Sequence, residues 1–214
     1  MIALSATSIR ARKAGRPSPR QRLLAAADEL FYTEGVHVVG IDRILEHADV
    51  AKASMYSAFA SKEALIAAYL QGRHTRNLER IWEAVEQHTD PRLRLLAVFD
   101  AQARCLQDSG YRGCAFARAS AETPTGGLVQ QATDDYRSAV LDLLTRLAAD
   151  AGAADPATLG LQLHLLYNGA AVLATPEQWL TLSQAIRSAA KTLLDTSLAR
   201  APTDHAQGAR GPTN

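Results

Sequence analysis

The chain has 214 residues, 47% hydrophobic and 21% charged, an ordinary composition with enough apolar material for one large or two small globular domains. The formal net charge of +1 excludes a uniformly basic or acidic chain, but residues 1–27 contain six Lys or Arg and no acidic residue, a local excess that favours nucleic acid as partner. Two cysteines, Cys105 and Cys114, exclude a disulfide scaffold, and the apolar runs are too short for a signal peptide or membrane span, so a cytoplasmic protein is expected.

Helix boundaries are marked by capping residues and prolines along most of the chain. Ser18, Pro19 and Gln21 follow the pattern of an N-cap, a first helical residue and a capping box. Asp90 and Asp155 each precede a proline in the same way. Alternation of apolar and polar residues, typical of strands, is nearly absent. The sequence therefore predicts an all-α fold of about nine helices, near 19–34, 41–48, 52–59, 61–88, 91–109, 114–122, 128–151, 156–174 and 177–199.

Each of the first three helices carries an apolar stripe at helical spacing, which would let them pack into a small core. Only residues 49–51 separate the second from the third, as in a helix-turn-helix. The outer face of the third is rich in short side chains that allow a duplex backbone to approach, with Lys52 and Tyr56 long enough to reach phosphate oxygens. Ser61 can cap the fourth helix, whose first N–H groups, with Lys62, would form an anion site.

Two spaced motifs in this region resemble those of TetR-family transcriptional regulators. "YSAFASKEAL" is similar to the family signature Tyr-x-x-Phe-x-x-Lys-Glu-x-Leu, and "RLLAAADELFYTEG" is similar to the family's first helix with its terminal glycine. The match covers about residues 18–70. By position, the resemblance implies DNA contacts from Lys52, Ser54, Tyr56, Ser57 and Lys62, with Gly40 and Arg43 touching the backbone.

Three positions depart from the family pattern. Asp49 stands in the turn where glycine is common, although aspartate can adopt the left-handed conformation. Ala58 replaces a frequent histidine, and Gly40 replaces a Thr or Ser cap. We expect the chain to dock on DNA as other family members do despite these changes. The bases that it recognises cannot be inferred from the family. In the alternative, Tyr56, Phe59 and Lys62 are ordinary bundle residues, which requires the whole set to be coincidental.

The expected domain organisation follows from these motifs. Residues 1–17 form a flexible basic arm, residues 18–63 the helix-turn-helix domain, residues 64–200 a ligand-binding and dimerisation domain, and residues 201–214 a disordered tail. The Gly-Arg-Pro tripeptide in the arm could enter a minor groove, but a solvated tail attracted by charge alone is favoured.

The eighth helix is apolar on two sides, so it must be covered on both. One seam contains Leu159 and Leu163, and a nearly opposite seam contains Leu161, Leu165 and Val172. One seam can face the helix's own core and the other needs a partner. We expect a two-fold homodimer through a four-helix bundle of helices eight and nine, which the family resemblance also implies. The predicted interface residues are Leu159, Leu163, Leu166, Leu173, Trp179, Leu182, Ile186, Ala189 and Leu193.

In the family that the sequence resembles, helices four to seven enclose a ligand cavity. Aromatic and polar residues in and near this region suit a largely apolar effector with a few polar groups. The candidate lining residues are Trp82, Phe99, Gln102, Cys105, Phe116, Tyr136, His164, Tyr167 and Asn168. The spacing of the six histidines predicts no metal site, and motifs for catalysis or for a cofactor are lacking.

The sequence therefore predicts a ligand-responsive DNA-binding transcriptional regulator, a repressor that a small molecule releases from a palindromic operator. One alternative is a thiol-based redox sensor that uses Cys105 and Cys114, although two buried structural thiols are favoured over such a pair. A helical enzyme is the other alternative, and it is disfavoured because no recognisable set of titratable groups converges in the sequence.

Overall fold

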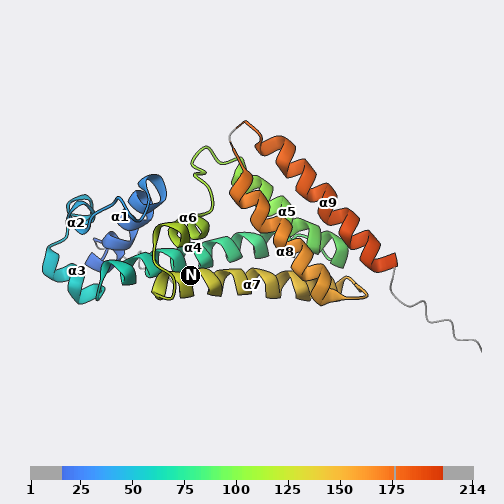
Figure 1. Cartoon of the computed structure of the whole chain (residues 1–214), viewed down its shortest axis with the longest axis horizontal. Coiled ribbons are helices and arrows are strands. Elements are labelled where there is room, and N and C mark those ends of the chain that lie inside the picture. The colour runs from blue at the N-terminus through green and yellow to red at the C-terminus, as the bar shows by residue number, and fades with distance from the viewer. Residues whose placement is uncertain (1–15, 176, 200–214) are drawn as a thin grey trace, which may run out of the picture.

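The computed structural model describes residues 16–175 and 177–199, and within these ranges it contains nine α-helices and no strand (Figure 1). The all-α prediction is confirmed, and every boundary lies within three residues of the predicted one. Predictions for residues 1–15, 176 and 200–214 fall outside the described residues. The helices are α1 (Pro19–Glu34), α2 (Ile41–Ala48), α3 (Lys52–Ala58), α4 (Lys62–Glu86), α5 (Pro91–Leu106), α6 (Ala115–Glu122), α7 (Leu128–Asp150), α8 (Pro156–Leu173) and α9 (Trp179–Ala199).

The predicted N-cap residues form hydrogen bonds at the amino ends of three helices. The hydroxyl oxygen of Ser18 accepts from the backbone N–H of Gln21 at 3.3 Å, and the Gln21 side chain accepts from the N–H of Ser18 at 2.9 Å. Asp90 accepts from the N–H of Arg92 at 2.7 Å, and Asp155 from that of Thr158 at 3.0 Å. These bonds satisfy N–H groups that have no partner within the helix, so each helix begins where its cap stands.

Helices α1 to α3 form a small bundle at one end of the molecule (Figure 1). Its core includes Leu23, Phe31, Ile44 and Met55, all at most 2% exposed. Helix α4 begins against this bundle and continues without a break into the larger part of the chain (Figure 1). The predicted division near residue 63 therefore falls inside a continuous helix, which can transmit a displacement from one end to the other.

The larger part consists of α4 to α9. Helices α4, α5, α7 and α8 pack together, and α9 lies across α5 and α8 (Figure 1). Gly160 lets α7 and α8 approach closely, because a Cβ at this position would lie only 2.9 Å from the Cα of Thr145. Within residues 16–175 and 177–199, none of the helices combines the length and apolar character needed to cross a bilayer.

Candidate nucleic-acid interface and internal cavities

The turn between α2 and α3 has the geometry that the sequence requires. Asp49 is left-handed, with φ of 50° and ψ of 56°, as predicted for the residue in place of glycine. Arg22 of α1 supports the turn by donating to the carbonyl oxygen of Ala48 at 2.9 Å and to that of Asp49. Arg16 forms an ion pair with the Asp49 carboxylate. Basic residues that add positive charge at the amino end thus also fix the angle between α2 and α3.

The outer face of α3 is open to solvent, and its inner face is buried. Met55 and Phe59 are at most 5% exposed and anchor the helix on the core. Tyr56 is 52% exposed and the side chain of Lys52 is 62% exposed, with exposed Ser57 beside them. Short side chains between these groups leave the backbone accessible, so the face can lie against the wall of a DNA groove.

Acidic neighbours partly neutralise the cations on this surface. The Lys52 amino group lies 3.2 Å from a carboxylate oxygen of Asp42. The Arg43 guanidinium donates to both carboxylate oxygens of Glu34, at 2.5 and 2.7 Å. All four groups are at least partly exposed, so the ion pairs are weak and a phosphate can compete for the cations.

Two other predicted contacts lie at helix starts. Gly40 is the exposed N-cap residue of α2, and a Cβ added here would meet no atom within 4 Å, so close approach is unobstructed. Ser61 caps α4 as predicted, accepting from the N–H of Ala64 at 3.1 Å. The Lys62 amino group donates to the carbonyl oxygen of His37 at 3.3 Å, and partial burial lowers its pKa despite the nearby Glu122 carboxylate. Its phosphate contact stays a prediction.

Arg20 has a structural role that the sequence did not indicate. Its guanidinium donates to the carbonyl oxygen of Ala58 at 3.0 Å and lies 4.3 Å from the centroid of the Phe59 ring. The guanidinium group thus supplies a hydrogen bond to a free carbonyl oxygen at the carboxyl end of α3 and covers the Phe59 ring of the signature motif. Because 38 residues separate Arg20 from Ala58, local spacing gives no signal for the contact.

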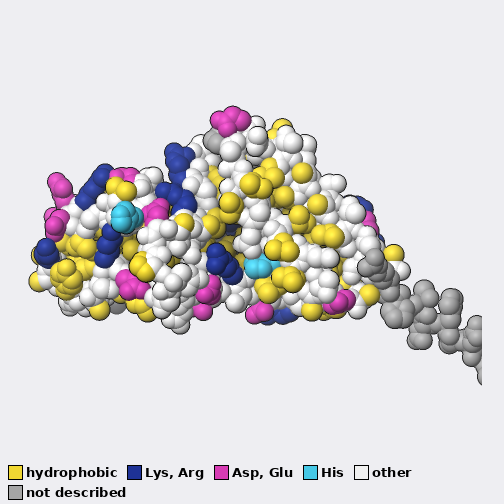
Figure 2. Space-filling view, in the orientation of Figure 1, with side chains coloured by type: hydrophobic (Ala, Val, Ile, Leu, Met, Phe, Trp, Pro, Cys, Tyr) yellow, Lys and Arg dark blue, Asp and Glu magenta, His cyan; other side chains and the backbone are white. Residues whose placement is uncertain are grey.

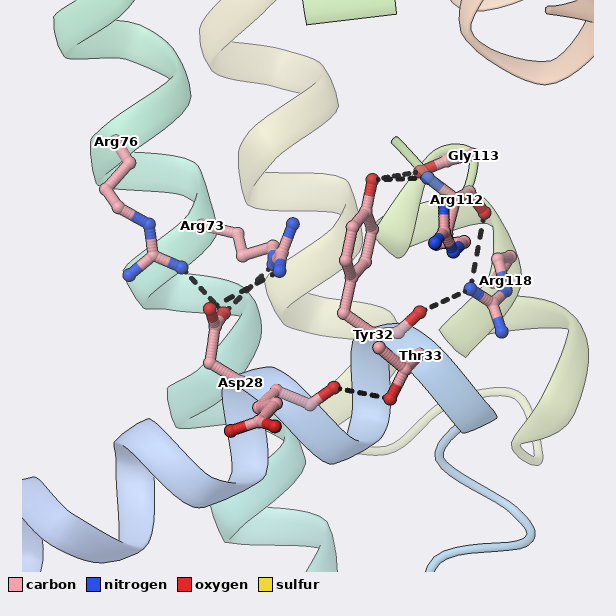
Figure 3. Close-up of polar contacts among 9 residues, drawn as sticks. Asp28, Tyr32, Thr33, Arg73, Arg76, Arg112, Gly113 and Arg118 are labelled. Atoms are coloured by element: carbon pink, nitrogen blue, oxygen red, sulfur yellow. Dashed lines mark hydrogen bonds and ion pairs between the residues drawn. The ribbon is translucent and has the colours of Figure 1, made fainter. Parts of the chain in front are cut away.

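Tyr32, near the end of α1, joins the small bundle to the segment before α6 (Figure 3). Its hydroxyl donates to the carbonyl oxygen of Gly113 at 3.2 Å and accepts from the N–H of Arg112 at 2.9 Å. Arg118 of α6 donates to the backbone oxygen of Tyr32 at 2.7 Å. Both the side chain and the backbone of one α1 residue are therefore held by the larger part of the chain.

Ion pairs join α1 to α4 beside this contact (Figure 3). Asp28 accepts from Arg73 at 2.9 and 3.3 Å and from Arg76 at 2.6 Å. The Arg73 guanidinium also lies 3.6 Å from the centroid of the Tyr32 ring. Half-buried Asp28 thus fixes two successive turns of α4 on α1.

Glu122, at the end of α6, makes a further contact with the small bundle. Its carboxylate accepts from the N–H of His37 at 2.9 Å. A Cβ at Gly35 would come within 2.9 Å of the same carboxylate, and Gly35 has a φ of 102°. Glycine is therefore required here both by the left-handed backbone and by the position of Glu122.

Two adjoining cavities lie where α4 to α8 converge. The outer cavity has a volume of about 680 Å³ and the inner chamber about 60 Å³. They share wall residues, among them Tyr111, Gly113 and Cys114. Six of the predicted lining residues face the inner chamber: Gln102, Cys105, Phe116, Tyr136, Tyr167 and Asn168.

Three predicted lining residues contact neither of these two cavities. Phe99 is fully buried in the core. Trp82 is half-buried and packs against the same core, and His164 is half-buried on α8. These three residues were predicted to line the cavity because they are aromatic or polar, but they do not line the chamber in the structure.

The inner chamber is lined by a connected set of polar and aromatic groups. The hydroxyls of Tyr136 and Tyr167 are 3.1 Å apart, and the Tyr136 ring stacks on Phe116 at 3.9 Å. Gln102 donates from Nε2 to the backbone oxygen of Tyr167 at 2.6 Å. Burial raises the pKa of both tyrosine hydroxyls, so they remain protonated hydrogen-bond donors.

The surface of α8 and α9 carries the largest set of exposed apolar side chains in the larger part. Leu161, Leu165, Val172, Leu173 and Leu180 are between 51% and 66% exposed. Figure 2 shows apolar side chains gathered over the face that these two helices form. An apolar surface of this kind marks an interaction site.

The predicted interface requires a correction. Leu159, Leu163 and Ile186 are at most 5% exposed, because they pack into the core of their own chain. The outward seam of α8 is the one that contains Leu161, Leu165 and Val172. Of the other predicted residues, Leu173 is exposed and five are at least partly accessible: Leu166, Trp179, Leu182, Ala189 and Leu193.

An exposed helix-turn-helix, joined by one continuous helix to a larger helical part with a cavity, is the architecture of a helix-turn-helix transcriptional regulator. The family described as "Bacterial regulatory proteins, tetR family" matches residues 23–69. The crystal structure of a TetR-family transcriptional regulator from Streptomyces coelicolor is 31% identical, with a TM-score of 0.78 over 84% of this chain and 96% of that chain. The chain therefore belongs to the TetR family.

The curated relatives include both a transcriptional activator and a transcriptional repressor. The transcriptional activator FasR of Mycolicibacterium smegmatis is 36% identical over 134 residues, which span 61% of this chain and 61% of FasR. The transcriptional repressor NemR of Escherichia coli is 30% identical over 123 residues, which span 56% of this chain and 59% of NemR. The matched segments thus cover about three fifths of each relative's length.

Proposed function

We propose that the chain is a homodimeric, ligand-responsive DNA-binding regulator, a repressor released from a palindromic operator by a small molecule. The observation that carries the DNA-binding part is the outer face of α3, where exposed Lys52, Tyr56 and Ser57 stand among small residues. In a two-fold dimer, two such helices would enter successive major grooves about 34–36 Å apart.

The contacts of Tyr32 and Asp28 support control by a ligand. They hold α1 against the 112–113 segment and against α4, and both of these elements line the cavities. A ligand that displaces the cavity wall would therefore change the distance between the two α3 helices. For a full switch it must bind the released form about 10⁴-fold better than the DNA-competent form.

DNA binding can be tested with inverted repeats from the region upstream of the chain's own coding sequence. Fluorescence anisotropy in dilute buffer, without effector, should show tighter binding to one such repeat than to a scrambled duplex of equal length. Equal affinity for the two duplexes would contradict the proposed function. In a reporter strain, deletion of the gene should raise expression from that promoter, whereas a fall would indicate an activator.

A thiol sensor is the second candidate, because Cys105 and Cys114 both line the inner chamber. Burial raises the pKa of the Cys114 thiol, which disfavours the reactive thiolate. A ligand-gated regulator predicts that Cys105→Ser and Cys114→Ser variants respond to peroxide no differently from the wild type in operator affinity. A peroxide response that either substitution abolishes would favour the sensor.

A further inference from the structure

Gln102 lines the inner chamber, and its side-chain oxygen is buried without a hydrogen-bond donor. The residue is 4% exposed. Its Nε2 donates to the carbonyl oxygen of Tyr167 at 2.6 Å, which fixes the orientation of the amide because only nitrogen can donate to a carbonyl. Oε1 must then be the free end, and it has no partner. A buried acceptor in this state is unfavourable unless another molecule supplies a donor.

Arg80 of α4 brings a positive charge to the same chamber. Its Nη2 donates to the side-chain oxygen of Asn77 at 3.1 Å, while Nε is buried without an acceptor. The other cation in the wall, Arg73, is paired with Asp28 at 2.9 Å. In the described part of the chain, no Asp or Glu lines the chamber or forms an ion pair with Arg80. Arg80 is thus a half-buried cation of the chamber wall without an acidic partner.

The tyrosine pair adds a second donor. Tyr136 and Tyr167 carry one hydroxyl hydrogen each, and only one of these can lie between the two oxygens, which are 3.1 Å apart. The side-chain nitrogen of Asn77 lies 3.5 Å from the Tyr136 oxygen, so Tyr136 accepts there. A hydroxyl hydrogen therefore remains for another acceptor. The chamber offers donors from Arg80 and a tyrosine, and one acceptor from Gln102.

We propose that the inner chamber binds the head group of the effector, and that this head group is a carboxylate with an adjacent hydroxyl, as in 2-hydroxy acids. The inference rests on the proposed function, in which the cavities hold the effector. The carboxylate would neutralise Arg80 and accept from a tyrosine, and the hydroxyl would donate to Oε1 of Gln102. The two groups must be adjacent, because a chamber of about 60 Å³ admits only a few heavy atoms.

The outer cavity suits the remainder of such a molecule. Its volume is about 680 Å³, and Leu106, Val172 and Trp179 are among its apolar wall residues. Tyr111 lines both cavities and donates from its hydroxyl to the carbonyl oxygen of Ala171 at 2.7 Å. An apolar body would leave the chamber past Tyr111 and fill the outer cavity.

The unpaired charge can be tested without a ligand. We expect Arg80→Gln to raise the melting temperature of the ligand-free full chain, because it removes a cation that no acidic group compensates. The matched control is Arg146→Gln, an exposed arginine on α7 that lines neither cavity, and it should leave the melting temperature unchanged. An unchanged or lower value for Arg80→Gln would show that the empty chain accommodates this cation, and would overturn the proposal.

The head group can be tested by calorimetric titration with three compounds that share one body. These are 3-phenyllactate, the neutral 3-phenyllactamide, and 3-phenylpropanoate, which lacks the hydroxyl. We expect 3-phenyllactate to bind about 10- to 100-fold more tightly than the amide and about 10-fold more tightly than 3-phenylpropanoate. Arg80→Gln should abolish the preference for the carboxylate, and Gln102→Met the preference for the hydroxyl. Equal affinities, or no binding at millimolar concentration, would overturn the assignment.

Operator binding separates this inference from the proposed function. If an inverted repeat is bound and the three compounds are not distinguished, the head-group assignment is wrong and the regulator remains. If the compounds are distinguished as expected and no inverted repeat is bound, the assignment stands and the proposed regulator is wrong.

Discussion

The hydroxyl of Tyr32 and the carbonyl oxygen of Gly113 are hydrogen bonded at 3.2 Å, which joins the end of α1 to a wall of both cavities. The same hydroxyl accepts from the N–H of Arg112 (Figure 3). Because α1 packs against α2 and α3, the proposed control by a ligand would act through this bond on the helices that carry the proposed DNA contacts.

Tyr32→Phe should weaken this connection while keeping the ring under Arg73. The loss of its hydrogen bonds should lower the free energy of unfolding by about 0.5–1.5 kcal/mol. Amide hydrogen exchange should become faster both in residues 112–114 and in the last turn of α1, because each segment restrains the other.

Tyr111→Phe is the matched control for that substitution. Its hydroxyl donates to Ala171 of α8, and within residues 16–175 and 177–199 no hydrogen bond joins that hydroxyl to α1. Exchange should therefore rise near residue 111 and at the end of α8 but not in α1. If Tyr32→Phe also left exchange in α1 unchanged, the hydrogen bond would not couple the two parts.

The ion pair between Lys52 and Asp42 predicts opposite effects of two substitutions on DNA binding. Lys52→Ala should weaken binding to all duplexes and reduce the salt slope by about one unit, because one phosphate contact is lost. Asp42→Asn should strengthen binding in dilute salt, because it removes a negative charge beside the phosphates.

Lys62→Ala should change the salt slope less than Lys52→Ala, since the Lys62 amino group already donates to the carbonyl oxygen of His37. Anisotropy titrations at several salt concentrations measure all three slopes, and equal slopes for wild type and Lys52→Ala would exclude Lys52 from the interface.

The helix-turn-helix could be predicted from the sequence because its determinants are local. The caps, the apolar stripes and the left-handed Asp49 each depend on residues a few positions apart. The choice between Leu163 and Leu165 as the outward residue could not be made in this way, because α8 is apolar on both sides and only the packing of α5, α7 and α9 decides. The partners of Tyr32 lie about 80 residues away along the chain, which no periodicity can reveal.

Leu165→Arg should give a folded monomer with poor operator binding. The side chain is 66% exposed, so arginine costs little in the single chain but places an unpaired charge in the proposed interface. Leu93→Arg is the control, since Leu93 is a 44% exposed apolar residue on α5 and does not belong to α8 or α9. Light scattering after size-exclusion chromatography should show a monomer for the first and an unchanged dimer for the second.

Leu163→Arg should behave differently from both. The side chain is fully buried, so a charge there should prevent stable folding and not merely dissociate a dimer. Loss of the cooperative thermal transition measures this outcome. A dimer that persists in Leu165→Arg would place the interface elsewhere on the chain.

Stability should fall as the pH drops below 6.5. Burial lowers the pKa of His74 and of His164 from their usual value of 6.5, with Asp135 opposing the shift at His74 and Arg137 adding to it at His164. The unfolded chain then binds protons more readily than the folded chain, so acid favours unfolding from that pH downward. In urea titrations at several pH values, His164→Gln should show a shallower decline than the wild type. Equal declines would mean that His164 titrates alike in both states.

Gly160→Ala should destabilise the chain, because its Cβ would meet the backbone of α7 as well as the side chain of Thr145. The nearest backbone atom, Cα of Thr145, would be 2.9 Å away, so the two helices must separate. Overpacking of this kind costs about 1–3 kcal/mol. Gly72→Ala, on α4, is the control: its nearest neighbour would be the end of the Arg76 side chain at 3.6 Å, and the higher helix propensity of alanine should stabilise the chain by about 0.5–1 kcal/mol. Urea unfolding of the two variants should therefore give changes of opposite sign, and changes of the same sign would show that α7 and α8 are not held at this distance.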